Sequence, residues 1–246
     1  MVVRRFALTS RLGTHIPEYV KRAFQFDQME LDSALSQMYS LCVNPSIVSK
    51  MSKARKMTKN HYHRDDPGLV VLQIVALVFT VAAYGLALRG GAFSHFLQYS
   101  VHSDHINYLL SAVVMATSTW LFAKHFMLNP SYISDAQREM DWQYSFDVHC
   151  NGYFPYFVWT KAVHYVFLPL VLQDSFLARL VGNSLHLIGC SLYIYVVFLG
   201  YLELPSLTQQ QKIMYPVPLL VVLMVFITLF TNWSLSQWSL RQMWSV

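Results

Sequence analysis

The sequence predicts an all-α polytopic membrane protein with five transmembrane helices and a small helical N-terminal region in the cytosol. Composition is the first reason: 54% of the 246 residues are hydrophobic and only 13% are charged, whereas soluble domains carry about 25% charged residues. The second is a series of long uncharged runs, each close to the roughly 20 residues that a helix needs to cross a bilayer. Helix is the expected conformation because lipid offers the backbone no hydrogen-bond partner.

The predicted spans follow a polar segment of about 68 residues. The clearest is residues 69–88, which contain no charged side chain and, at about 1.5 Å per residue, match a hydrocarbon core about 30 Å thick. The other four are expected at 106–124, 153–172, 180–202 and 214–233. The run 153–172 is the least apolar, because it contains Lys161, His164 and two prolines. Without it, the number of spans would be even and both termini would lie on one side.

Positive charge sets the predicted orientation. Of the 18 Lys and Arg residues, eleven lie between Arg4 and Arg64. The connection 90–105 has none, and the next connection has Arg138. Lys and Arg accumulate on the cytosolic side of spans, so the N-terminus is expected in the cytosol. The predicted organisation is a cytosolic basic head at 1–68, a membrane bundle at 69–233 and a short lumenal tail at 234–246.

Two helices are expected in the head. Asp27 and Glu30 have the spacing of a helix cap, and Asn44-Pro45 is typical of the boundary between two helices. The first helix has an apolar stripe at helical spacing, formed by Leu31, Ala34, Leu35, Met38 and Cys42. In the second helix, one face is formed by Ile47, Met51 and Ala54.

The second head helix is also strongly basic. Its positive residues are Lys50, Lys53, Arg55, Lys56 and Lys59. A basic amphipathic helix beside a span is typical of a helix that lies on an anionic leaflet, so the predicted partner is the lipid bilayer. The alternative is a helix packed on the bundle with its lysines solvated. RNA binding by the same lysines is a further alternative, although no recognisable nucleic-acid module accompanies them.

Two polar clusters flank predicted spans. Arg64, Asp65 and Asp66 precede the first span, and Asp147, His149 and Asn151 precede the third. The predicted topology puts both clusters at the cytosolic membrane edge, where they can meet. We expect them to form a structural or docking cluster, since charges at membrane edges pair and anchor the chain.

A metal site is the alternative for the same region. His61, His63, Asp147 and His149 offer nitrogen and oxygen ligands for zinc or a similar divalent ion, which would suit a metal-dependent enzyme acting on lipid at the interface. Their spacing matches no catalytic histidine box, and no nucleotide- or phosphate-binding motif is present. Neither an enzyme activity nor a cofactor is therefore predicted.

A small transporter is a second alternative. Lys161 with His164, and Asn183 with His186, form i, i+3 pairs inside predicted spans. Ionisable groups in a span are costly and often functional. Hydrogen bonding between helices also explains these two pairs. It is the favoured interpretation, because no acidic residue lies deep in a span.

Five segments, taken in order, resemble the UNC-fifty (uncoordinated-fifty) family of Golgi membrane proteins. The segments are FQFDQMELDSALSQMYSL (residues 24–41), RDDPGLVVL (64–72), DWQYSFDVHCNGYFP (141–155), YIYVVFLGYLELPSL (193–207) and the pair Tyr215-Pro216. The resemblance extends from about Tyr19 to about Trp233, and residues 1–17 lie outside it.

The resemblance implies a non-enzymatic protein of the Golgi, and also of the endoplasmic reticulum, with five spans and a cytosolic N-terminus. It also implies a role in vesicle trafficking and surface delivery of membrane cargo such as nicotinic acetylcholine receptors. The implied partners are a large Arf guanine-nucleotide exchange factor, the membrane-protein cargo and, less directly, RNA. His61, His63, Lys161 and His164 do not belong to the family pattern, which weakens the metal and transport alternatives.

Overall fold

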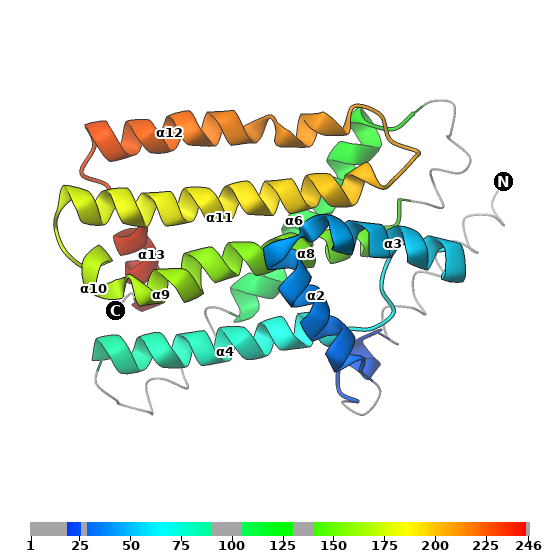
Figure 1. Cartoon of the computed structure of the whole chain (residues 1–246), viewed down its shortest axis with the longest axis horizontal. Helices are drawn as coiled ribbons and strands as arrows, with labels where there is room; N and C mark the ends of the chain where they lie inside the picture. The colour runs from blue at the N-terminus through cyan, green and yellow to red at the C-terminus, as the bar shows by residue number, and fades with distance from the viewer. Residues whose placement is uncertain (1–18, 26–28, 90–104, 130–139, 245–246) are drawn as a thin grey trace.

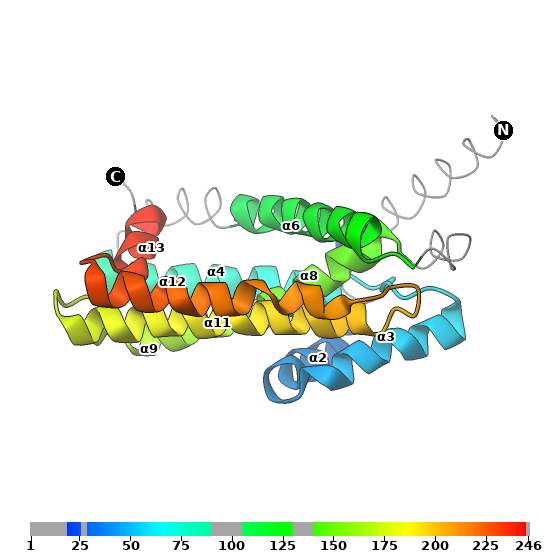
Figure 2. The same cartoon turned by 90° about the horizontal axis from the view of Figure 1, so that it is seen from above.

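The computed structural model describes residues 19–25, 29–89, 105–129 and 140–244, which are almost wholly helical and contain no strand. Long helices lie side by side along one direction, and helices α2 and α3 pack on one flank of this bundle (Figures 1 and 2). The predicted cap at Asp27 lies outside the described residues, and so does Arg138, on which part of the orientation argument rests.

Among the described residues, four helices are long and apolar enough to cross a membrane, namely Gly68–Leu88, Tyr108–Phe126, Phe176–Leu202 and Gln210–Phe230. They lie in α4 (Gly68–Arg89), α6 (His105–Phe126), α11 (Phe176–Leu202) and the consecutive helices η5 (Gln210–Met214) and α12 (Pro216–Phe230). These positions match four of the five predicted spans. The prediction of a helical multi-pass membrane protein is confirmed, and the count of five is not.

The remaining predicted span, 153–172, is divided among shorter helices. The chain forms α8 (Trp142–Phe157), a π-helical segment η4 (Val158–Val163), α9 (His164–Val166) and α10 (Leu168–Val171). Pro155 removes a backbone donor inside α8, and the wider π-helical turn begins three residues later. The 16 residues of α8 extend about 24 Å, less than the hydrocarbon core of a bilayer. The backbone angles stay helical from Phe157 through His164, so α8, η4 and α9 follow one another without a break, although none of them alone has spanning length.

Helices α8 and α11 form the most extensive contact of the bundle. Glycines on α11 bring the two helices close together. A Cβ on Gly200 would lie 2.7 Å from Val148 Cγ2, and a Cβ on Gly189 would lie 2.8 Å from Thr160 Cγ2. Small residues at crossings allow backbones to approach in this way in membrane bundles, so α8 and η4 lie against α11 over much of its length.

The C-terminal segment also joins the bundle. The predicted lumenal tail forms α13 (Leu235–Trp244), which packs against α11. Leu240 is buried beside Tyr84 and Leu168, and Ser236 lies against Gly182. The segment is therefore anchored to the bundle by apolar burial, which its mixed polar and apolar sequence did not indicate.

The described part of the head contains α2 (Leu31–Val43) and α3 (Pro45–Lys59). The turn at Asn44-Pro45, called the elbow below, lies where the sequence predicts it. The faces differ from those predicted. In α2 the buried residues are Ala34, Gln37, Met38 and Leu41, whereas Leu35 is 54% exposed and Cys42 is exposed.

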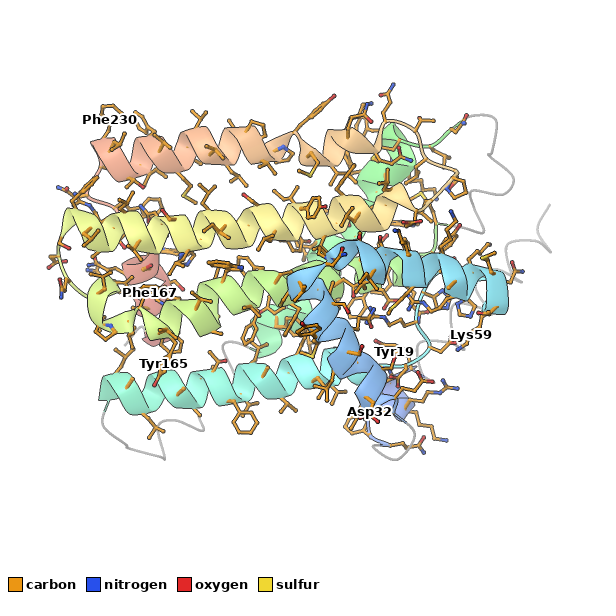
Figure 3. The ribbon with its side chains drawn as sticks, viewed as in Figure 1. Tyr19, Asp32, Lys59, Tyr165, Phe167 and Phe230 are labelled. Carbon is orange, nitrogen blue, oxygen red and sulfur yellow. The ribbon has the colours of Figure 1, made fainter. Side chains whose placement is uncertain are left out.

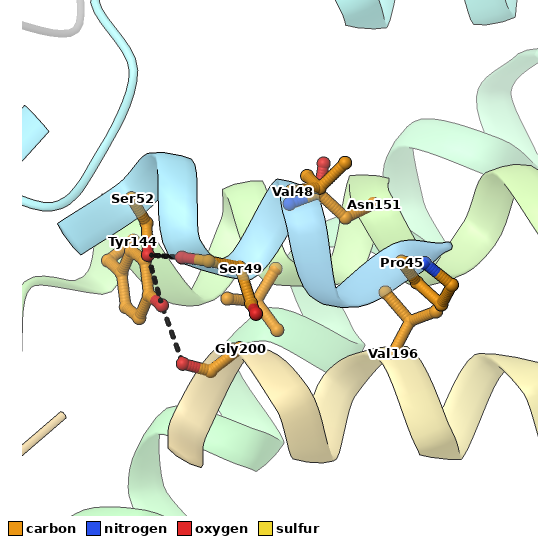
Figure 4. Close-up of a pocket in the computed structure, with 9 residues that line it drawn as sticks. Pro45, Val48, Ser49, Ser52, Tyr144, Asn151, Val196 and Gly200 are labelled. Atoms are coloured by element: carbon orange, nitrogen blue, oxygen red, sulfur yellow. Dashed lines mark hydrogen bonds between the residues drawn. The ribbon is translucent and has the colours of Figure 1, made fainter. Parts of the chain in front are cut away.

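In α3 the predicted apolar face is turned outward, and a face of small residues is buried instead. Val48, Ser49 and Ser52 are buried in a shallow pocket between α3, α8 and α11 (Figure 4). Ser52 Oγ lies 3.4 Å from the Tyr144 hydroxyl, which donates to the Gly200 carbonyl oxygen at 2.6 Å. Small serines let α3 approach the bundle closely, which explains why the larger Ile47 and Met51 lie on the other side.

Candidate functional site

Arg64, in the connection between α3 and α4, is held along one face of α8. Its backbone N–H donates to Asp147 Oδ2 at 2.5 Å, and its guanidinium donates from Nη2 to Asn151 Oδ1 at 2.5 Å. Its carbonyl oxygen accepts from Gln143 Nε2 at 3.1 Å. The three α8 residues are spaced by four, so they lie on one helical face. We call these four residues the Arg64 joint.

The Arg64 joint is shielded from solvent. Arg64 is 7% exposed, Asp147 2% and Asn151 9%. Burial raises the pKa of the Asp147 carboxyl, while the positive charges of Arg64 and Arg55 and the Arg64 N–H oppose that rise. A buried cation and a buried anion stabilise each other only while both stay in place. The joint therefore fixes the head to the bundle at one position.

Only part of the predicted docking cluster meets in this way. Arg64, Asp147 and Asn151 come together, whereas Asp65 and Asp66 form local contacts. Asp66 Oδ2 accepts from the Gly68 N–H at 3.3 Å, at the start of α4. Asp65 Oδ2 lies 2.7 Å from Lys59 Nζ.

Asp65 is the more exposed of the two acids, with a side chain 30% exposed. Partial burial acts to raise the pKa of Asp65, but the hydrogen bond from Lys59 and the nearby His61 outweigh it, so the pKa is lowered. Asp65 is therefore a negative group at the surface, available to a partner.

His149 belongs to a separate contact between α8 and α11. Its Nδ1 lies 2.9 Å from the Tyr193 hydroxyl. The ring is 3% exposed, so the imidazole acts as a hydrogen-bonding group within the helix pair.

Buried polar residues that the sequence did not single out connect two further helices, α4 and α6, to α8. Gln73 of α4 donates from Nε2 to the Cys150 carbonyl oxygen at 2.8 Å, and the Tyr108 hydroxyl of α6 donates to Gln73 Oε1 at 2.5 Å. Gln73 and Tyr108 are each 2% exposed. Gln143 could have been found from sequence, because its spacing of four from Asp147 puts both residues on one helical face. Gln73 and Tyr108 are uncharged and lie in apolar runs, so nothing in the sequence indicated their contacts.

The predicted metal ligands do not form one set. Among the described residues, His61, His63 and Asp65 have potential ligand atoms within 4.8 Å of one another, whereas Asp147 and His149 make the contacts described above. The rings of His61 and His63 stack with centroids 4.1 Å apart and planes 14° apart. Their lone pairs lie in nearly parallel planes, so one ring would have to rotate before both could bind one ion.

The polar groups proposed for a transport path bond to one another or to nearby helices. His164 Nδ1 lies 2.7 Å from the Tyr84 hydroxyl, and the rings of His164 and His186 meet edge to face at 5.8 Å. Asn183 donates to Thr228 Oγ1 at 2.9 Å. These contacts favour the structural interpretation of both pairs.

The basic residues of α3 divide into two groups. Lys50, Lys53 and Lys59 are exposed and Lys56 is partly exposed. Arg55 points inward and donates from Nε to the Tyr62 carbonyl oxygen at 3.2 Å, and burial lowers its pKa. The lysines therefore form the accessible basic surface, and Arg55 supports the connection that leads to Arg64.

Comparison with known families matches residues 19–244, which include α2, α3, the Arg64 joint and the whole bundle, to the UNC-50 family. The chain belongs to the UNC-50 family. It is 31% identical over 216 residues to an unc-50 homolog of Dictyostelium discoideum, covering 88% of this chain and 83% of the relative. It is 32% identical over 229 residues to the unc-50 protein of Caenorhabditis elegans, covering 92% and 73%.

The human unc-50 homolog is similarly related, at 32% identity over 222 residues, 89% of this chain and 83% of the human protein. No solved structure matches this chain. The resemblance noted in the five sequence segments is thus confirmed at the level of the family.

Proposed function

We propose that this UNC-50 family member is a non-enzymatic Golgi membrane protein that supports vesicle trafficking and surface delivery of selected membrane cargo. In this proposal the bundle engages the membrane-protein cargo, and the head helps to recruit a large Arf guanine-nucleotide exchange factor. Membership of the UNC-50 family over residues 19–244 is the observation that carries the proposal.

The attachment of the head to the bundle supports this division of labour. Three residues of α8 bind Arg64, and α3 also packs on α11. A head held in this way presents Asp65, with Lys59 beside it at the end of α3, to a cytosolic partner at a defined place. Recruitment of a large soluble factor to a membrane needs such a fixed, charged surface rather than a catalytic centre.

We also propose that the divided run at 153–172 makes a fifth crossing. The helices from α8 to α10 follow α11 along its length: Val148 lies against Gly200 at one end, and Val171 lies 3.7 Å from the Cβ position of Gly182 near the other. A segment packed along a spanning helix over that distance shares its passage through the bilayer. Five crossings put the two termini on opposite sides of the membrane. Because Lys and Arg accumulate on the cytosolic side, the basic N-terminus is then in the cytosol and the C-terminus in the lumen.

The test is proximity labelling in cells, with the labelling enzyme fused at Met1 and the fusion imaged in parallel. The proposal predicts a Golgi image and enrichment of Arf exchange factors. Labelling restricted to lumenal proteins would contradict the orientation, and a mitochondrial image would contradict the location.

Variants then separate the role of the head from folding. Asp65→Ala alters a partly exposed acid and should reduce exchange-factor labelling and cargo delivery at unchanged protein levels. Asp147→Ala should reduce both, with a loss of protein as well. Asp32→Ala, which changes another exposed acid of the head, is the matched control. Normal recruitment and delivery by Asp65→Ala at normal abundance would rule out docking through this acid.

A further inference from the structure

The outer face of the head carries an exposed apolar ridge. Its members are Leu35, Tyr39 and Val43 of α2 and Ile47 and Met51 of α3, which are 54%, 71%, 66%, 44% and 38% exposed. They are spaced by four along each helix and continue across the elbow. An exposed row of apolar side chains of this kind indicates a contact with a partner or a membrane.

The depth of the elbow indicates what covers the ridge. On its inner side, Leu41 and Val48 pack against Val196 of α11, together with Phe154. From Val196 the apolar helix continues to Leu202, and the first charged residue, Glu203, comes seven residues after Val196. That is about 10 Å further along the helix axis. The elbow therefore lies beside the apolar part of a spanning helix, inward from its charged end.

Polarity along the head changes in the same direction. Asp32 and Lys59 mark the two ends of the α2–α3 pair that lie away from the elbow (Figure 3). Near the elbow, two serine hydroxyl groups have hydrogen-bond acceptors within the head. Ser46 Oγ donates to Asn44 Oδ1 at 2.6 Å, and Ser40 Oγ donates to the Ser36 carbonyl oxygen at 2.9 Å. Such local bonds are what a group in lipid needs, because lipid supplies no partner.

We infer that the elbow is inserted into the bilayer leaflet on the side of the head, with the apolar ridge in contact with acyl chains. Lys50 and Lys53, exposed on α3 beyond the elbow, then lie at the level of the headgroups and bind anionic phosphates. Lipid is the occupant rather than a soluble protein, because a soluble partner would have to enter the hydrocarbon layer to reach Val43. This inference does not depend on the trafficking role.

The test uses nitroxide labels on the full chain in vesicles of phosphatidylcholine and phosphatidylserine. One label is placed at Val43→Cys and a second, in a separate protein, at Tyr39→Cys. Every labelled protein, including the two references, also carries Cys42→Ser and Cys190→Ser, because Cys42 is exposed and Cys190 is partly exposed. Collision with oxygen, which partitions into lipid, is compared with collision with a water-soluble nickel chelate. Phe79→Cys, on the 71% exposed outer face of α4, is the lipid-facing reference, and Met57→Cys, at an 83% exposed site, is the water-facing reference.

Insertion predicts that the labels at Val43 and Tyr39 have the high oxygen-to-nickel ratio of Phe79, several-fold above that of Met57. A ratio equal to that of Met57 at both positions would place the ridge in water and overturn the inference in favour of a protein-docking face. Replacing phosphatidylserine with phosphatidylcholine should make the Val43 label shallower. An unchanged depth would overturn the headgroup contact of Lys50 and Lys53.

Discussion

Removal of the Asp147 carboxylate is the most direct test of the Arg64 joint. In Asp147→Ala the buried Arg64 N–H loses its acceptor, which costs about 1–3 kcal/mol. The variant also loses the attraction between the Asp147 carboxylate and the nearby positive charges of Arg64 and Arg55, which adds to this cost because the site is buried. Relief of the unfavourable burial of Asp147, evident in its raised pKa, offsets part of this sum. We expect a net destabilisation of about 3 kcal/mol.

For a chain of this length the loss corresponds to a decrease in Tm of about 6–12 °C, measured by loss of the monodisperse peak after heating in one mild detergent. Asp147→Asn keeps an oxygen acceptor for the N–H and should lose only about 1 kcal/mol. Asp32→Ala, at an exposed site, should change stability by no more than about 0.5–1 kcal/mol. An equal Tm for Asp147→Ala and Asp32→Ala would refute the reasoning, because it would mean that the Arg64 joint does not stabilise the fold.

Three further outcomes are expected in the same unfolding assay. Gly200→Ala puts a Cβ 2.7 Å from Val148 Cγ2 and should cost about 1–3 kcal/mol; adding Val148→Ala should recover part of the loss, and a purely additive double variant would contradict the close approach. Gln73→Leu removes the acceptor of the buried Tyr108 hydroxyl and the donor to the Cys150 carbonyl oxygen. It should cost about 1–3 kcal/mol, whereas no change would indicate that these hydrogen bonds do not form. His149→Leu removes the hydrogen-bond partner of the Tyr193 hydroxyl and should cost about 1–3 kcal/mol, whereas no change would indicate that this contact does not hold α8 to α11.

The apolar residues of the head illustrate what sequence periodicity can and cannot resolve. Spacing correctly predicted two helices and the turn at Asn44-Pro45. It did not predict which side of each helix meets the bundle, because α2 is apolar on two sides: Ala34 and Met38 face the bundle, while Leu35 is exposed. The predicted stripe therefore combined residues from both sides of α2 into a single face. Periodicity measures amphipathicity against water, and a helix that contacts both protein and lipid has two apolar sides.

The same reasoning applies to the run at 153–172. Hydropathy indicated a span there and the chain is helical there, but Pro155 and the π-helical segment interrupt the regular α-helix. Its stability comes instead from contact with α11 at glycines such as Gly189. Such a contact depends on which residues face each other across two helices, and one sequence does not contain that pairing.

For the Arg64 joint, the predicted topology was sufficient to bring two distant segments to one membrane edge, and Arg64, Asp147 and Asn151 do meet there. The topology did not supply Gln143, whose neutral amide carries no charge signal, and it wrongly grouped His149, which faces Tyr193 instead. Charge predicts which groups must be paired when buried, but hydrogen-bond geometry decides the partner.

The chemistry of Arg64 explains why a cation is buried at this position at all. Its backbone N–H and carbonyl and its guanidinium each bind a different residue on one face of α8. A lysine would keep both backbone bonds but would place a compact, strongly hydrated charge where a planar guanidinium now donates to Asn151. Movement of the head away from the bundle would leave that charge and Asp147 unpaired in a buried site. The head and the bundle therefore move as one body, and any partner that binds α3 is held at a fixed position relative to the spans.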